Sequence, residues 1–265
     1  NTERPIYLMR KHLGHGISSE KFTKQLELRT IEKNEKRKKT PTARKRLFYT
    51  NREGVHKGDK FYGENCEKPD MLEEEFLKAK TEFLEALRKS PTETAEIEIA
   101  TRHQQDSDDW YIERRKRLTA SKFGEVCKMR ETTSCRIMVS NIIYSREFFS
   151  RACQFGKDNE AAAKESVEKI IGKTIRPCGL FIDEEFPFFG ASPDGMIEDK
   201  GILEIKCPWS ARNVTPEEGV KRKFISFWNN STGEVNQNHN WFYQIQGQLH
   251  IAKKSYCVFA VWTPY

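Results

Sequence analysis

Two short apolar segments that carry charged residues, 194–198 and 202–207, constrain the fold more than any other part of the sequence. In the second segment charged and apolar residues alternate, which predicts a strand with Glu204 and Lys206 on one face. A glycine lies between the two segments, where a turn would pair them. Such pairing would bring Asp194, in the turn-like sequence S-P-D-G, close to Glu204.

Asp194, Glu204 and Lys206 are the residue types that metal-assisted cleavage of a phosphodiester requires. Carboxylates bind hard cations through oxygen, and such cations stabilise the attacking and leaving oxygens of an in-line displacement. A lysine beside them can orient the attacking water or help to deprotonate it. Two other interpretations stay open from these residues alone, since alternating charges also mark a solvated strand face and Asp-Gly is common in hairpins.

Three further polar residues are candidates for the same site. Glu160 lies at the edge of the apolar face of a helix predicted over 158–171, and a carboxylate that points inward needs a cation or a donor. Gln244 and Gln248 lie one turn apart in a predicted helix over 241–253. The alternatives are an ordinary glutamate near a helix N-terminus and glutamines on a solvent face.

Arg114, Ser121 and Ser192 are candidate donors for a phosphate group. Arg114 lies in a predicted helix over 110–117, and its planar guanidinium matches phosphate geometry. Ser121 begins the next predicted helix, whose free amides carry partial positive charge. A basic surface patch is the alternative explanation for this arginine-rich helix.

The order of predicted elements is that of a mixed α/β fold. The helices we expect cover 70–90, 110–117, 119–126, 136–151, 158–171, a segment that starts at Thr215, and 241–253; the strands cover 174–182, 194–198, 202–207 and 256–263; residues 91–106 are expected to be a linker and 229–240 a loop. We therefore expect a basic N-terminal region over 1–105, helical or irregular with one clear helix near 70–90. A catalytic domain should follow over 106–265, and we expect that domain to continue beyond the last residue.

Composition excludes several classes of protein. The chain of 265 residues carries a net charge of +7, and in its first 60 residues Lys and Arg outnumber Asp and Glu by more than two to one. The densest runs, 36–39 and 44–46, predict contact with nucleic acid or a nuclear import signal, with a merely solvated segment as the alternative. The seven cysteines form no C-x2-C pair, which disfavours zinc and a disulfide framework. Neither a membrane span nor a secretory signal is visible, so we expect an intracellular protein, nuclear if its host is eukaryotic.

Five motifs follow one another in a specific order. They are W-x3-R-x3-L-T-A-S (110–121), G-x3-E-x2-A (156–163), G-A-S-P-D-G (190–195), L-E-I-K-C-P (203–208) and Y-Q-I-Q-G-Q-L (243–249). Together they resemble the lambda-exonuclease/YqaJ-like viral recombinase family of the PD-(D/E)XK nuclease superfamily. The resemblance covers about 108–264, and residues 1–105 resemble nothing that we can place.

The resemblance implies a restriction-endonuclease-like core, in which helices flank a central mixed sheet. It also implies a role for each candidate residue. Glu160, Asp194, Glu204 and the carbonyl of Ile205 would bind Mg2+, with Mn2+ able to substitute; Lys206 would position and activate the water; Gln244 would lie beside the scissile phosphate; Arg114, Ser121 and Ser192 would hold a 5′-phosphate.

The activity implied by the resemblance is 5′→3′ degradation of linear double-stranded DNA in recombination, with a single-strand annealing protein as partner. Similarity to alkaline nucleases keeps an endonuclease on DNA or RNA open as an alternative. A catalytically inactive DNA-binding module on the same fold is a second alternative. The basic N-terminal region is not part of the minimal family domain, so the oligomeric state of family members cannot be transferred to this chain.

Overall fold

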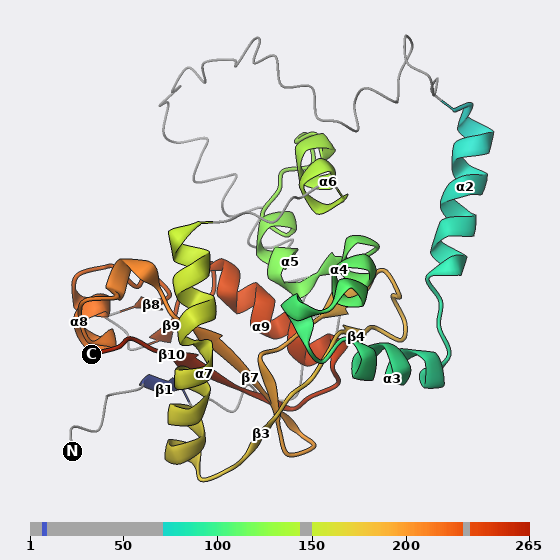
Figure 1. Cartoon of the computed structure of the whole chain (residues 1–265). Helices are drawn as coiled ribbons and strands as arrows, with labels where there is room; N and C mark the ends of the chain where they lie inside the picture. Colours follow the sequence, from blue (N-terminus) through green and yellow to red (C-terminus); the bar gives the residue numbers. More distant parts are fainter. Residues whose placement is uncertain (1–6, 10–70, 144–149, 230–233) are drawn as a thin grey trace, which may run out of the picture. The chain divides into compact units, whose positions relative to one another are not determined.

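The computed structural model describes residues 7–9, 71–143, 150–229 and 234–265 (Figure 1). The chain divides into two compact units, one formed by 1–16 with 80–265 and the other by 17–79. The basic runs 36–39 and 44–46, which were expected to contact nucleic acid, lie outside the described residues. Helix α2 (Glu73–Ala86) includes residues of both units.

A five-stranded mixed sheet forms the centre of the first unit, with the strand order β1-β10-β7-β6-β3. Its strands are β1 (Tyr7–Met9), β10 (Tyr256–Val261), β7 (Gly201–Lys206), β6 (Gly195–Ile197) and β3 (Ile175–Arg176). β10 and β7 run parallel, whereas the other three pairs are antiparallel. The predicted mixed α/β fold is therefore confirmed, and β1 adds an edge strand that the sequence did not reveal.

Two helices cover the opposite faces of this sheet: α7 (Arg151–Ile171) and α9 (Asn240–Ile251) (Figure 1). The alternation of β10 explains the arrangement, because successive side chains point to opposite faces. Val258 and Ala260 pack in the cluster that contains the buried residues of α7. Cys257, Phe259 and Val261 pack in the cluster that contains the buried residues of α9.

Helix α7 is longer than the predicted 158–171. Ser150 caps its N-terminus, and Gly172 ends it in the left-handed conformation with φ of 65°. On the apolar face expected for this helix, Ala163 and Val167 are fully buried, whereas Ile170 has an exposed fraction of 50%. Ile170 lies in the last turn of the helix.

A second sheet has the strand order β2-β5-β4. Its strands are β2 (Leu118–Thr119), β5 (Phe189–Ala191) and β4 (Phe181–Ile182), and near it lie the helices α4 (Asp108–Arg115) and α5 (Ala120–Val126). The single strand predicted over 174–182 is wrong, because the chain leaves one sheet after β3 and enters the other at β4. Helix α6 (Arg136–Ile143) accounts for the first half of the helix expected over 136–151.

Two segments predicted to lack regular structure contain it. Residues 91–106 form helix α3 (Pro91–Ala100) and the 3-10 turn η2 (Gln104–Asp106). Ser90 caps α3 in a capping box with Glu93, and Pro91 is the first residue of this helix. The expected loop over 229–240 contains part of a hairpin between β8 (Trp228–Asn229) and β9 (Glu234–Val235).

The remaining short elements connect β7 to α9. They are the 3-10 turn η3 (Trp209–Ala211) and helix α8 (Pro216–Lys221), and the predicted cap of α8 is confirmed, since the Thr215 hydroxyl accepts a hydrogen bond from the amide of Glu218. No helix in the described ranges has both the length and the apolar character that crossing a membrane requires.

Candidate active site

The antiparallel pairing of β6 with β7 places Asp194 beside the end of β7. Gly195 pairs with Leu203, and the amide of Asp194 donates a hydrogen bond of 3.0 Å to the carbonyl of Leu203. The carboxylate of Asp194 accepts a hydrogen bond of 2.6 Å from the amide of Ile205. The pairing expected from the sequence is thus present, and it holds Asp194 at both its backbone and its side chain.

Glu204 is buried against helix α9, with an exposed fraction of 2%. Its Oε1 accepts a hydrogen bond of 2.7 Å from the amide of Gln244, and its Oε2 accepts one of 2.6 Å from Gln248. The ammonium group of Lys206 also binds Oε1. The two glutamines, which lie one turn apart on α9, therefore face inward. Together they orient the carboxylate of Glu204 on β7.

The electrostatics of this cluster follow from its burial. Burial raises the pKa of Asp194 well above its usual range, and the nearby charge of Glu204 raises it further. Burial alone would lower the pKa of Lys206, but the carboxylates of Glu204 and Asp194 outweigh it, so the pKa is raised. The lysine therefore keeps its proton at neutral pH and offsets part of the negative charge.

Glu160 joins the cluster from helix α7. Its side chain is half-buried, and burial raises its pKa, with Lys164 acting in the opposite direction and Glu204 in the same direction. Its charge also raises the pKa of Asp194. Asp194, Glu204 and Lys206 thus lie together where β6 and β7 pair, and Glu160 of α7 is near enough for its charge to act on theirs.

Arg114 and Ser192 lie together, close to the carboxylates. The guanidinium donates to the hydroxyl of Ser192 at 3.4 Å and stacks on the ring of Trp110, with its Cζ atom 4.1 Å from the centroid. Burial lowers the pKa of Arg114 to about 10, against the opposing influence of Tyr111 and Glu204. The hydroxyl of Ser121, by contrast, contacts Thr119 at 3.0 Å, so the structure does not join it directly to the other two.

Trp110, the first residue of the W-x3-R motif, also belongs to this group, although it was not a candidate site residue. Its indole Nε1 donates a hydrogen bond of 2.9 Å to the hydroxyl of Ser192. The spacing of four residues places Trp110 and Arg114 on one helical face. Trp241 was not predicted at the site, and its ring centroid lies 5.9 Å from the ammonium nitrogen of Lys206.

In the part of the chain that the structure describes, no three His, Cys, Asp or Glu side chains form a group that could hold a metal ion. The carboxylates of Glu204 and Asp194 are instead satisfied by nitrogen donors. The amide and the carbonyl of a strand residue point to the same side of the strand. Because the amide of Ile205 donates to Asp194, the carbonyl of Ile205 also points to the side on which Asp194 lies. The oxygen atoms here are of the type that hard cations prefer.

Comparison with known families agrees with the motifs. The model of the YqaJ-like viral recombinase domain matches residues 109–255, which is more than half of the chain. This chain belongs to the YqaJ-like viral recombinase domain family. The matched range contains every candidate residue named from the sequence, from Arg114 to Gln248.

Two solved structures are similar to the YqaJ-like chain. One is an alkaline exonuclease (LHK-Exo) from Laribacter hongkongensis, with 23% identity, a TM-score of 0.47, and coverage of 60% of this chain and 75% of that chain. The other is LHK-Exo in complex with dAMP, with 25% identity, a TM-score of 0.47, and coverage of 59% and 74%. No curated protein sequence matches the chain.

Proposed function

We propose that the YqaJ-like domain is a Mg2+-dependent nuclease of the PD-(D/E)XK type that hydrolyses phosphodiester bonds of linear double-stranded DNA. The observation that carries the proposal is the grouping of Asp194, Glu204 and Lys206 at the end of β7, with the charge of Glu160 acting on them from α7. A structural role does not require several carboxylates so close together, because burying charge is costly. Membership of the family supports the same conclusion.

The charges of the cluster fit a divalent cation. Once ionised, the three carboxylates concentrate negative charge that is offset in part by Lys206, by Lys164 near Glu160 and by Arg114 near Glu204. Glu160, Asp194, Glu204 and the carbonyl of Ile205 would hold Mg2+, and Mn2+ can substitute because both cations accept oxygen ligands. The bound ion would supply Lewis-acid stabilisation of the charge that develops on the phosphate.

Lys206 and Gln244 act on the water and on Glu204. Because the pKa of Lys206 is raised, its ammonium donates hydrogen bonds, and it would orient the attacking water rather than remove its proton. Gln244 fixes Oε1 of Glu204, which is also the oxygen that Lys206 contacts. We therefore assign both side chains to positioning the carboxylate and the water relative to each other.

The group formed by Arg114, Ser192 and Trp110 suits a terminal 5′-phosphate. Trp110 and Arg114 both donate to the hydroxyl oxygen of Ser192, so the hydroxyl hydrogen remains available for an incoming anion. Arg114 adds a positive charge, and because the guanidinium is buried, its attraction to a phosphate is stronger than it would be in water. We infer that degradation proceeds 5′→3′ from a phosphorylated end, and we keep Ser121 as a more distant contact to the DNA.

The deciding experiment compares three DNA substrates in Mg2+ and in excess chelator: linear duplex with 5′-phosphate, linear duplex with 5′-hydroxyl, and closed circular duplex. We expect rapid degradation of the first, slower degradation of the second, none of the third, and no cleavage with chelator. Cleavage that persists in chelator contradicts the metal. Equal rates on both linear ends, with efficient cutting of the circle, favour the alternative of an endonuclease.

Arg114→Ala tests the 5′-phosphate contact specifically. The ratio of rates on phosphorylated and hydroxyl ends should fall towards one, because the variant loses a charge-assisted hydrogen bond of about 1.5–3 kcal/mol. Arg115→Ala is the matched control, since Arg115 is exposed on the same helix. Single-turnover rates on the two ends measure the ratio, and an unchanged ratio in Arg114→Ala excludes this contact.

The setting of the activity is part of the proposal. Removal of the 5′ strand leaves a 3′ single strand, which a single-strand annealing protein would bind. We place the enzyme inside the cell, and in the nucleus if the host is eukaryotic, because its DNA substrate is found there.

A further inference from the structure

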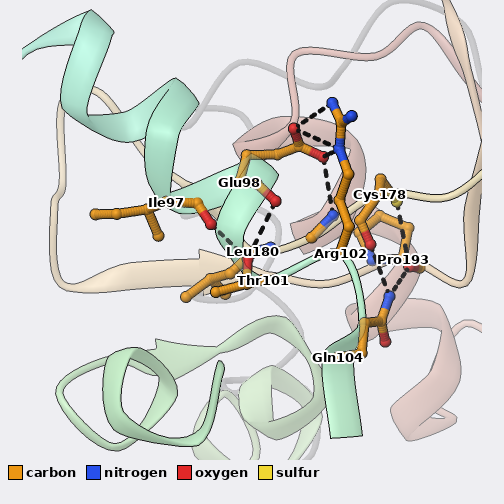
Figure 2. Close-up of polar contacts among 9 residues, drawn as sticks. Ile97, Glu98, Thr101, Arg102, Gln104, Cys178, Leu180 and Pro193 are labelled. Carbon is orange, nitrogen blue, oxygen red and sulfur yellow. Dashed lines mark hydrogen bonds and ion pairs between the residues drawn. The ribbon is translucent and has the colours of Figure 1, made fainter. Parts of the chain in front are cut away.

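Helix α3 and the turn η2, which precede the matched family region, hold the segment that connects β3 to β4 (Figure 2). The amide of Gly179 donates a hydrogen bond of 2.9 Å to the carboxylate of Glu98. The amide of Leu180 donates one of 2.7 Å to the hydroxyl of Thr101. Gln104 donates from its side-chain amide to the carbonyl of Cys178 at 3.0 Å. Three consecutive residues are thus bound by three side chains of the preceding segment.

The packing at this interface is tight. The carboxylate of Glu98 is oriented by Arg102, whose guanidinium donates at 2.7 Å and 3.1 Å. A Cβ atom added to Gly179 would lie 2.0 Å from the carbonyl oxygen of Glu98 and 2.4 Å from the hydroxyl of Thr101. A side chain larger than glycine therefore has no room, and the helix and the connecting segment have a fixed relative position.

Gln104 extends this contact to the candidate active site. Its side-chain amide also donates a hydrogen bond of 2.8 Å to the carbonyl of Pro193, the residue that precedes Asp194 (Figure 2). The thiol of Cys178 donates to the same carbonyl at 3.4 Å, and burial raises its pKa to about 12, so it keeps its proton. Gln104 itself has a φ of 45°, a left-handed conformation that costs free energy in a residue other than glycine.

We propose that Gln104 is a positioning residue that sets the location of Asp194 through the carbonyl of Pro193. Its two donated hydrogen bonds join the carbonyls of Cys178 and Pro193, which belong to different strand connections. The amide of Asp194 is bound to Leu203 on the other side, so the peptide before Asp194 is held from two directions. The expected effect of Gln104 on the rate of cleavage rests on the proposed function, whereas its effect on the location of Asp194 does not.

Two variants remove the donors in different ways. Gln104→Glu keeps the shape of the side chain but presents oxygen to two carbonyl oxygens, and Gln104→Ala removes the side chain. We expect kcat on 5′-phosphorylated linear duplex to fall about tenfold in both, because a small displacement of a catalytic group is costly. KM for DNA ends should stay within about twofold, since Gln104 has no proposed contact with DNA. Gln105→Ala, at an exposed neighbouring residue, is the matched control.

Amide hydrogen exchange separates this inference from the proposed function. The amides of Asp194 and Ile205 should exchange several-fold faster in both Gln104 variants than in Gln105→Ala, with or without nuclease activity. Unchanged exchange at these two amides overturns the inference. Faster exchange with an unchanged kcat overturns its catalytic part. If the wild-type protein cleaves no DNA but the two amides still exchange faster in the Gln104 variants, the positioning role is supported. In that case only the proposed function is contradicted.

Discussion

At the scale of single residues, Asp194 illustrates the electrostatic cost of the site. It is a desolvated carboxylate whose neighbours Glu204 and Glu160 carry the same charge, and these three influences raise its pKa. The folded protein therefore binds a proton at Asp194 more tightly than the unfolded chain does. Stability falls as pH rises from the pKa of the unfolded carboxyl to the higher pKa of the folded one, and the loss persists above it.

Asp194→Asn should consequently raise the melting temperature of the metal-free protein while it lowers activity. The gain, on the order of a few degrees, should grow as pH is raised from about 4 and level off above the folded pKa. Cleavage should fall at least about 100-fold, because charge stabilisation at a metal is worth several kcal/mol. Thermal melts in chelator across pH, with single-turnover assays in Mg2+, measure both.

The matched control for this prediction is Asp199→Asn. Asp199 lies in an exposed turn and contributes only a surface ion pair with Arg176, so its loss should change neither stability nor rate appreciably. A metal-free Asp194→Asn protein that melts below wild type at pH 8 would mean that the hydrogen bond from Ile205 outweighs the electrostatic cost.

Lys206→Ala should strongly reduce cleavage and leave the binding of Mn2+ largely intact. The lysine acts on the water and on Oε1 of Glu204, and it is not an oxygen ligand. Lys206→Arg should not restore the rate, because a guanidinium differs from an ammonium in shape and donor geometry. Calorimetric titration of the two variants with Mn2+ checks the division of roles, and complete loss of binding in Lys206→Ala would contradict it.

The sequence predicted those site residues whose roles depend on local periodicity. Alternation on β7 placed Glu204 beside Lys206, and the spacing of Gln244 and Gln248 placed both on one face of α9. Contacts between residues distant in sequence could not be predicted in this way. The hydrogen bond from Gln104 to Pro193 has no periodic signature, because it depends on how two loops meet.

At the scale of elements, helix α3 belongs to the fold although the matched family region begins after it. A chain that begins at Ser107 loses the acceptors of the buried amides of Gly179 and Leu180. Each buried amide without an acceptor costs about 1–3 kcal/mol. We expect such a chain to melt on the order of 5–10 °C below one that begins at Arg88, which keeps α3.

Calorimetry of the two truncated chains provides the measurement for this prediction. Both lack β1, so the comparison isolates residues 88–106 and needs no correction for the edge strand. Equal melting temperatures would show that the hydrogen bonds from α3 contribute little to stability.

Elements of two or three residues explain most of the errors in the sequence-based prediction. β3, β4 and β5 are too short to show a period of two, and β3 and β4 lie in different sheets. The expected linker over 91–106 begins at Pro91 because proline disrupts a helix interior, although proline is also favoured in the first turn of a helix. Longer elements such as α7 and α9 were predicted from their large apolar faces, although α7 begins earlier than expected.

At the scale of the whole molecule, the uneven charge predicts a contribution to DNA affinity that is independent of DNA sequence. Replacement of the seven basic residues in 36–39 and 44–46 by glutamine should weaken binding at low salt. The slope of log K against log salt should decrease by up to about 0.9 for each phosphate contact that is lost. The rate at saturating DNA should remain unchanged, because no proposed catalytic group lies there.

Binding isotherms at several salt concentrations measure this slope, and an unchanged slope would assign the basic runs to another purpose. Neutralisation is preferable to deletion of residues 1–60, since deletion also removes β1 from the central sheet.

The overall mixed α/β class was predictable from the order of long elements. The edge strand formed by residues 7–9 was not predictable. A segment of three residues is too short to show a periodic pattern, and its partner β10 is distant in the sequence.

The parallel pairing of β7 with β10 has a consequence for the time at which the enzyme becomes active. β7 carries Glu204 and Lys206, but its neighbour in the sheet follows only after α8, the hairpin and α9. Non-local pairing of this kind forms late, because the intervening chain must first be ordered. On the ribosome, Glu204 has neither its glutamine partners nor a complete sheet until residues 240–261 have emerged. The site around Glu204 is thus complete only after the chain has been synthesised through β10.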